Sequence, residues 1–162
     1  MVTAIYPGSF DPVTNGHLDI ANRAARLFDR VTFAVYARPA KNILFSVEQR
    51  VQMIGEAIQE YPNIGVDAYE SLTVEYARQV GAQVIIRGLR VLTDFEYELQ
   101  MAHTNHRLDA GIEVICLMAS QNYSFLSSSI VKEIAALGAD VGNLVPPHVA
   151  QALREVLKRG HA

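Results

Sequence analysis

A turn-rich stretch near the N-terminus holds the residues best suited to chemistry. Residues 6–17 read Tyr-Pro-Gly-Ser-Phe-Asp-Pro-Val-Thr-Asn-Gly-His and lie between an apolar segment and an amphipathic one. A strand that ends in such a turn leaves unpaired backbone N–H groups at the next helix start, where the helix dipole adds about half a positive charge. Gly8 lets a ligand approach the backbone, and Gly16 leaves space beside the imidazole of His17. The stretch therefore predicts an anion site.

Two later segments carry further groups that bind anions, and each also has an ordinary structural explanation. Arg87 and Arg90 follow a short apolar run, so their guanidinium groups leave the end of a strand close together. They either bind an anion or pair with a carboxylate of the next helix, Asp94 or Glu98. Residues 127–129 are three consecutive serines at a helix start. One hydroxyl can cap the helix, and the spare hydroxyls can then hold phosphate oxygens.

Strands and helices are predicted to alternate along the chain. Apolar runs predict five strands, each followed by a helix, at residues 2–6, 31–37, 64–69, 84–86 and 112–118. The expected helices span residues 17–28, 46–61, 74–80, 93–108, 127–137 and 146–157. This alternation indicates an α/β fold: a single-domain, doubly wound, Rossmann-like and mainly parallel sheet with helices on both faces, occupying residues 1–162.

The candidate residues share one edge of that sheet. Ligands of parallel sheets bind beyond the carboxyl ends of the strands. Four turn segments follow predicted strands at that edge, at residues 8–17, 38–41, 87–90 and 123–129. We therefore expect them to converge on one crevice. Lys41 by itself is most simply a solvated surface lysine.

Periodicity also predicts where several side chains point. The helix that Thr93 caps is expected to carry Phe95, Leu99 and Ala102 on its inward face. Cys116 lies in an apolar strand, so we expect a buried and unreactive thiol.

Length and composition exclude several classes of protein. The chain has 162 residues, of which 50% are hydrophobic and 19% charged, so it can bury a core and is not disordered. No apolar run approaches the ~20 residues that span a bilayer, and no signal core follows the first residues. The single cysteine cannot form an intrachain disulfide, and a net charge of −3 gives no basic field for nucleic acid. We expect a cytoplasmic protein with neither a membrane nor a nucleic-acid partner.

The motifs resemble those of a known family. Residues 8–12, Gly-Ser-Phe-Asp-Pro, and 14–17, Thr-Asn-Gly-His, resemble the two boxes of the nucleotidylyltransferase superfamily. The later blocks at residues 87–90, 94–98 and 123–129, with Lys132, are similar in order to those of the phosphopantetheine adenylyltransferase family. The likeness covers almost the whole chain and is weaker over residues 61–83 and after Leu137. Leu126 stands where isoleucine is commoner, and Tyr123 where tryptophan also occurs; neither changes the polar chemistry.

The resemblance implies adenylyl transfer from ATP to phosphopantetheine, which gives dephospho-coenzyme A and pyrophosphate in coenzyme A biosynthesis. It implies catalytic roles for His17, Lys41 and Arg90. It places the acceptor on Ser9, Lys41, Thr73 and Arg87, and ATP on Ser9, Phe10, His17, Gly88, Leu89, Arg90, Glu98, Tyr123, Ser124, Phe125, Leu126, Ser127, Ser128 and Ser129. It further implies Mg²⁺ that arrives with ATP, with no protein metal ligands, and a homohexamer.

Three alternatives stay open beside this interpretation. The chain could transfer an adenylyl or cytidylyl group to another acceptor, because the Gly-His box serves many members of the superfamily. It could also be a regulatory module that binds ATP without turnover. The first loop is similar to the first box of class I aminoacyl-tRNA synthetases as well, but neither a tRNA-binding domain nor a lysine-rich second box accompanies it.

Overall fold

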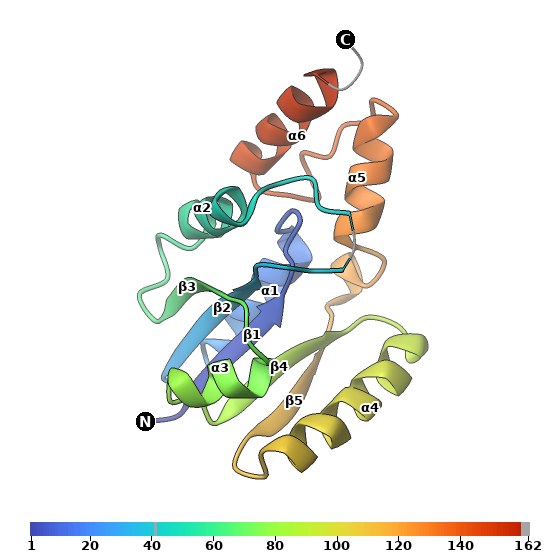
Figure 1. Ribbon diagram of the computed structural model, residues 1–162. Coiled ribbons are helices and arrows are strands. Elements are labelled where there is room, and N and C mark those ends of the chain that lie inside the picture. The colour runs from blue at the N-terminus through green and yellow to red at the C-terminus, as the bar shows by residue number, and fades with distance from the viewer. Residues whose placement is uncertain (41, 160–162) are drawn as a thin grey trace.

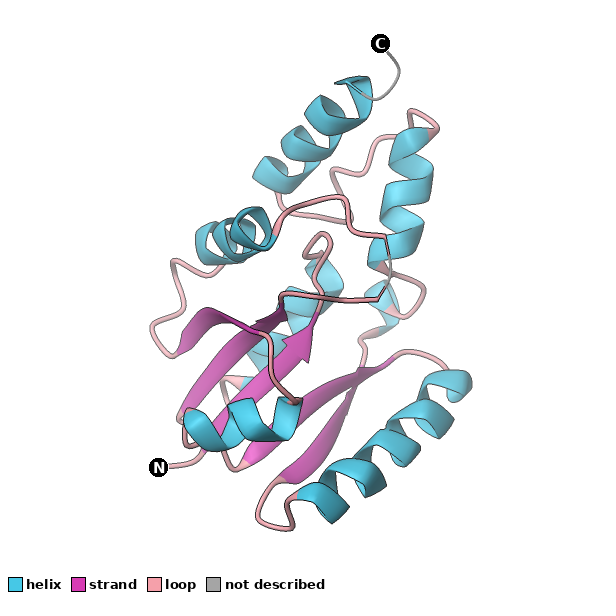
Figure 2. Ribbon diagram, in the orientation of Figure 1, coloured by secondary structure: helices cyan, strands magenta, loops and turns pink. Residues whose placement is uncertain are grey.

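The sheet is the centre of the fold. The computed structural model of the chain describes residues 1–40 and 42–159. Five strands form one sheet in which every neighbouring pair is parallel (Figures 1 and 2). In sheet order the strands are β3 (Ile64–Tyr69), β2 (Arg30–Tyr36), β1 (Thr3–Gly8), β4 (Val84–Leu89) and β5 (Glu113–Met118). The predicted Rossmann-like α/β fold is therefore confirmed.

Helices cover both faces of the sheet. They are α1 (Asn15–Ala24), α2 (Val47–Ala57), α3 (Thr73–Gln79), α4 (Leu92–Leu108), α5 (Ser128–Ala136) and α6 (Pro147–Arg159), with a 3-10 turn at Gln121–Tyr123. Figure 1 shows α3 in front of the sheet and α1 behind it. Alternate residues of a strand point to opposite faces. Ala4 and Tyr6 of β1 accordingly pack with α1, α2, α5 and α6, whereas Ile5 packs with α3. Within the described residues, no helix combines the length and apolarity needed to cross a bilayer.

The sheet is narrowly joined at its centre. All six residues of β1 pair with β2. With β4, β1 shares only two pairs, Ala4 with Val84 and Ile5 with Ile85. Beyond Ile5 the two strands part, and the loop after β1 and the end of β4 border the opening. The strand order also reverses between β1 and β4, which is where open α/β sheets bind ligands.

A predicted strand end and a predicted helix cap near this opening are wrong. β4 does not end at Ile86 but continues to Leu89, so most of the expected 87–90 loop belongs to the strand, and Arg87 lies opposite Cys116 of β5. α4 begins at Leu92, and no side chain caps it. The carboxylate of Asp94 instead accepts a hydrogen bond from the backbone N–H of Arg90, at 3.0 Å. The sequence underestimated β4 because a glycine and two arginines resemble a turn.

The orientation of α4 also differs from the prediction. Phe95 and Leu99, expected to face inward, are 48% and 44% exposed, whereas Ala102 is half-buried. The buried residues of α4 are Glu98 and Asn105, both polar. They point inward because the inner side of this helix borders a cavity. Periodicity identified an apolar face correctly but could not show that this face lies on the surface of the chain.

Cys116 is exposed, so the expectation of a buried thiol is wrong. β5 is an edge strand with β4 on one side only, and the residues along it are half-buried or exposed. Partial burial still raises the pKa of the Cys116 thiol, and the nearby Glu98 carboxylate adds to this increase.

Candidate active site

The start of α1 fixes His17. The Thr14 hydroxyl accepts a hydrogen bond from the backbone N–H of His17 at 3.3 Å, and the backbone N–H of Thr14 donates to Nδ1 of His17 at 3.0 Å. This reciprocal arrangement is a capping box, which satisfies two backbone N–H groups at the helix start. Because Nδ1 accepts, a neutral imidazole carries its hydrogen on Nε2. The cap therefore assigns the donor of His17 to the far side of the ring.

Aromatic rings pack against the imidazole. The ring centroid of Phe10 lies 5.0 Å from that of His17, 5.4 Å from that of Tyr6 and 5.1 Å from that of Phe33, each edge to face. Such geometry is favourable for aromatic pairs. Phe10 has a φ of 47°, a left-handed conformation uncommon outside glycine. A Cβ on Gly8 would lie 2.9 Å from Cζ of Phe10, so a side chain at position 8 would displace this ring.

A cavity of about 320 Å³ opens beside His17. Its walls come from the loop after β1, the start of α1, the end of β4 and the start of α5. The predicted site residues in its lining are Ser9, Phe10, His17, Arg87, Gly88, Arg90, Glu98, Tyr123, Leu126, Ser127, Ser128 and Ser129. The structure thus brings together most of the residues that the sequence analysis singled out, and their individual roles stay predictions. Leu89, Ser124 and Phe125 are not in this lining, and Phe125 is exposed.

The phenol of Tyr6 adds a neutral polar group to this cavity. Tyr6 is a buried residue of β1 that lines the cavity. Burial raises the pKa of Tyr6, and the nearby charges of Arg87 and Arg90 oppose that increase only in part. Tyr6 therefore stays protonated and can donate a hydrogen bond.

The serine-rich start of α5 forms one wall. The hydroxyl of Ser127 caps the helix by accepting a hydrogen bond from the backbone N–H of Ile130, at 3.2 Å. The sequence predicts spare hydroxyls here, but the hydroxyl of Ser128 is already used: it donates a hydrogen bond to the carbonyl oxygen of Pro12 at 2.8 Å. This bond attaches α5 to the loop after β1. Ser129 also lines the cavity.

Arg87 and Glu98 form an ion pair in the opposite wall. Nε and Nη2 of Arg87 donate to the two carboxylate oxygens of Glu98 at 2.8 and 2.7 Å, and Nη1 donates to the carbonyl oxygen of Pro7 at 2.8 Å. Burial lowers the pKa of Arg87, but Glu98 raises it by more, so the guanidinium stays charged. Three of its five N–H groups make these bonds, which leaves two for an anion.

Arg90 is paired as well. Its Nε donates to Asp94 at 3.1 Å, and its Nη1 donates to the carbonyl oxygen of Leu126 at 3.2 Å. Both arginines therefore have a carboxylate partner on α4, which is one of the two alternatives that the sequence left open. These pairs orient the guanidinium groups along the cavity wall.

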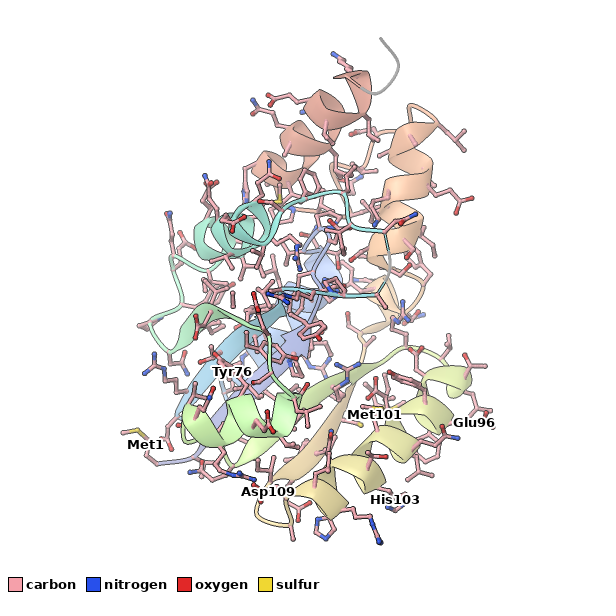
Figure 3. The ribbon with its side chains drawn as sticks, in the orientation of Figure 1. Met1, Tyr76, Glu96, Met101, His103 and Asp109 are labelled. Atoms are coloured by element: carbon pink, nitrogen blue, oxygen red, sulfur yellow. The ribbon has the colours of Figure 1, made fainter. Side chains whose placement is uncertain are left out.

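A second cavity of about 370 Å³ adjoins the first. The residues common to both linings are Pro7, Gly8, Ser9, Arg87 and Glu98. The second lining also includes Thr73, whose hydroxyl lies 2.9 Å from the phenol oxygen of Tyr69. Met101 and Asn105 of α4 contribute from the other side, and Figure 3 shows Met101 toward the sheet and His103 away from it. Lys41, a predicted contact of the acceptor, lies outside the described residues.

Sequence reasoning missed two buried charges beneath these cavities. Asp11 is fully buried, although the sequence indicated only a turn, and its partners are far away along the chain. Arg50 is 1% exposed and donates to the carbonyl oxygens of Ser9, Tyr36 and Phe45 at 2.7, 2.9 and 3.1 Å. A signal for Arg50 did exist, because it lies on the apolar face of α2.

The fold and the site together define a class of protein. Residues 5–134 match the family model described as cytidylyltransferase-like. A parallel sheet that leads through a Gly-Ser-Phe-Asp-Pro loop into a capped Gly-His helix start, beside a cavity, is the arrangement expected of such nucleotidyltransferases.

Individual relatives narrow the class. A phosphopantetheine adenylyltransferase of Herpetosiphon aurantiacus is 56% identical over 155 residues, covering 96% of this chain and 94% of the relative. Enzymes of the same name from a Roseiflexus species and Synechococcus elongatus are 54% and 57% identical over 159 and 152 residues. The alignments cover 98% and 94% of this chain, and 99% and 92% of those relatives. The chain belongs to the phosphopantetheine adenylyltransferase family.

Proposed function

We propose that this chain transfers the adenylyl group of ATP to phosphopantetheine, forming dephospho-coenzyme A and releasing pyrophosphate. The observation that carries the proposal is the adjacency of the two cavities, which share the Pro7–Ser9 backbone and the Arg87–Glu98 pair. The first cavity gathers His17, two arginines and the start of a helix, groups that suit a triphosphate. The second, lined largely by tyrosines and apolar side chains, suits an elongated acceptor whose phosphate reaches Arg87.

The reaction needs positioning more than proton transfer. An oxygen of the acceptor's phosphate attacks the α-phosphorus of ATP and forms a new P–O bond, while the bond from that phosphorus to the bridging oxygen of the β-phosphate breaks. The attacking oxygen is already an anion near neutral pH, so no side chain has to remove a proton. Catalysis then consists of alignment and of stabilising the charge that develops on the α-phosphate and on pyrophosphate.

The proposed roles follow the positions of the side chains. Nε2–H of His17 donates to an α-phosphate oxygen, because its other ring nitrogen is held by the helix cap. Arg90 and the start of α5 receive the β- and γ-phosphates. Arg87 and Ser9 hold the phosphate of the acceptor at the junction of the cavities, and Thr73 borders its remaining length. The role of Lys41 on the same phosphate is proposed from the family resemblance alone. Gly88, Glu98 and Tyr123 border the nucleotide.

Magnesium is proposed to arrive with ATP as part of the substrate. In the described residues, no group of three or more His, Cys, Asp or Glu side chains is arranged to hold a metal ion. The two acids of the first cavity, Asp94 and Glu98, are each bonded to an arginine. Mg²⁺ commonly binds the phosphate oxygens of a nucleotide substrate together with water molecules. The bound ion neutralises part of the charge of the phosphates.

We also propose a homohexamer that works in the cytoplasm, with residues 1–162 acting as a single domain because one sheet carries both cavities. Support for an assembly comes from α4, where Leu92, Phe95 and Leu99 share one exposed flank of the helix. Exposed apolar surface on this scale is typical of interfaces. The free thiol of Cys116 is in keeping with a reducing compartment.

A coupled pyrophosphate assay tests the reaction. Pyrophosphate release from ATP should depend on phosphopantetheine, and mass spectrometry should detect dephospho-coenzyme A. If dephospho-coenzyme A is absent and another dinucleotide forms when other acceptors are supplied, phosphopantetheine is not the acceptor. ATP binding without any release would identify a regulatory module.

A further inference from the structure

Asp11 is a buried carboxylate at the meeting point of three segments. Its side chain is fully buried; Oδ2 accepts a hydrogen bond from the backbone N–H of Leu44, and Oδ1 from that of Phe45, both at 2.9 Å. Nζ of Lys132 donates to Oδ2 at 2.7 Å. One carboxylate therefore joins the loop after β1, the loop before α2 and helix α5.

Two of these segments are walls of the first cavity. Asp11 directly follows Phe10, whose ring packs on His17. Lys132 lies one helical turn after Ser128, whose hydroxyl donates to the carbonyl oxygen of Pro12. α5 is thus attached to the loop at two successive loop residues. Neither Asp11 nor Lys132 lines either cavity, so any effect on the reaction passes through the groups that they hold.

The charges make this attachment specific to one geometry. A buried carboxylate is costly unless it is paired and hydrogen-bonded. Asp11 meets this condition with two backbone N–H groups and one ammonium, which come from two different segments. The guanidinium of Arg50, which attracts Asp11 electrostatically, fixes the carbonyl of Ser9 on the other side of the loop. A shift of α5 relative to the loop larger than the Lys132 side chain can follow would break its 2.7 Å contact with Asp11.

We infer that Asp11 and Lys132 are positioning residues that hold the serine-rich start of α5 at a fixed distance from His17. The inference rests on the proposed function, in which His17 contacts the α-phosphate while α5 receives the leaving pyrophosphate. Both contacts must form at once, and a misplacement of about 1 Å can cost about 10²-fold in rate.

The test compares Lys132→Met, which keeps the alkyl chain without its charge, with Lys132→Arg, which keeps the charge. Lys132→Met should lower kcat about 10- to 10²-fold in the folded protein. It should also weaken ATP binding several-fold in calorimetry while leaving AMP binding unchanged, because only ATP carries the phosphates that α5 receives. Lys132→Arg should recover most of both losses. Arg78→Met is the matched control, since it breaks an equally short ion pair, with Asp109 at 2.7 Å, away from both cavities.

The outcomes separate this inference from its alternatives. Unchanged kcat and an unchanged ratio of ATP to AMP affinity in Lys132→Met would overturn it, and so would equal losses in Lys132→Arg and Lys132→Met. If wild-type protein binds ATP but catalyses no transfer, the proposed function is refuted. The ratio of ATP to AMP affinity in Lys132→Met, compared with wild type, would still test the inference. If Lys132→Met does not fold, the double variant Asp11→Asn with Lys132→Met leaves no unpaired carboxylate and should show the same losses.

Discussion

The guanidinium of Arg87 meets the carboxylate of Glu98 through two hydrogen bonds, and this pair stands on the boundary shared by the two cavities. Arg87 adds a third bond to the carbonyl of Pro7, at the end of β1. The pair therefore bridges the opening between β1 and β4. Three of the five N–H groups of Arg87 make these bonds, so the ion pair is compatible with the phosphate contact proposed for the same side chain.

Arg87→Ala should chiefly weaken the use of phosphopantetheine. A charge-assisted hydrogen bond contributes roughly 1.5–3 kcal/mol, which corresponds to an increase of about 10- to 10²-fold in KM for that substrate. Steady-state kinetics with each substrate varied in turn would measure it. Because the variant leaves Glu98 without its partner, the double variant with Glu98→Gln serves as the control for repulsion between Glu98 and the phosphate. A variant impaired only toward ATP would contradict the assignment of Arg87.

His17→Ala should lower turnover far more than ATP binding. The proposed hydrogen bond from Nε2 strengthens as charge accumulates on the α-phosphate, so its loss resembles the loss of an oxyanion donor. We expect kcat to fall about 10²–10³-fold, or about 2.7–4 kcal/mol. Steady-state kinetics and ATP titration on the same preparation would show whether kcat falls more than the affinity for ATP.

His17→Gln separates catalysis from the helix cap. A glutamine at this third helical position keeps an acceptor for the backbone N–H of Thr14 and so preserves the capping box. Its melting temperature should stay near that of the wild type while kcat stays low. Near-normal turnover in His17→Ala, accompanied by a lower melting temperature, would show that His17 only caps the helix.

Gly8→Ala should destabilise the protein and slow the reaction together. The new methyl group would lie 2.9 Å from the ring of Phe10 and push it against His17. Overpacking of this kind costs about 1–3 kcal/mol. Gly55→Ala in α2 is the control, because its Cβ has only an ordinary contact of 3.8 Å with Val66 and should add about 0.5–1 kcal/mol of helix stability. Urea unfolding of both variants would test this, and equal stability of the two would refute it.

The Arg90–Asp94 pair should contribute to the pH dependence of stability in acid. Burial raises the pKa of Asp94, but the hydrogen bonds from Arg90 lower it by more, so the pKa lies below its ordinary value of 3.8. The contribution is present above pH 3.8 and is lost as the pH falls through the folded-state pKa. Asp94→Asn should reduce the free energy of unfolding at pH 7 by about 1 kcal/mol or less. The difference from wild type should vanish in strong acid, and a constant difference down to pH 2 would contradict the assignment.

Phe95→Asp should reduce the size of the assembly. Phe95 lies on the exposed apolar side of α4, where a carboxylate would have to be desolvated on association. Light scattering should give the wild type a mass near six times 17.9 kDa and the variant a smaller one. Gln52→Asp, at an exposed position of α2, should leave the mass unchanged. A wild-type mass of 17.9 kDa at micromolar concentration would exclude the homohexamer.

The strands and several helix starts were predictable because local patterns determine them. Largely apolar segments identified all five strands, and the bounds of β3, the weakest of these segments, agree with the prediction. The Ser-x-x-Gln pattern at Ser46 and Gln49 is typical of a helix start, and the two residues form a capping box at the start of α2. Such features depend on residues within one turn of one another, which the sequence displays directly.

The features that the sequence did not reveal depend on distant partners. Lys132 and Asp11 are 121 positions apart, so no spacing rule links them. The exposure of Phe95 and Leu99 shows another limit, because an apolar helix face looks the same whether it is covered by its own chain or by a second one. From the sequence, Arg87 could either bind an anion or pair with a carboxylate of the next helix. Its pairing with Glu98 depends on how the chain turns between β4 and α4, which local patterns do not show.

The two residue pairs between β1 and β4 have a consequence for dynamics. In the described sheet they are the only strand pairing that connects the three-stranded half, β3-β2-β1, with the two-stranded half, β4-β5. Sub-global opening of the protein should therefore begin with a separation of these halves. Amides that flank the opening should exchange hydrogen faster than amides in the middle of each half. Substrates bound across the opening would hold both halves, so occupancy itself would rigidify the molecule and slow that exchange throughout the sheet.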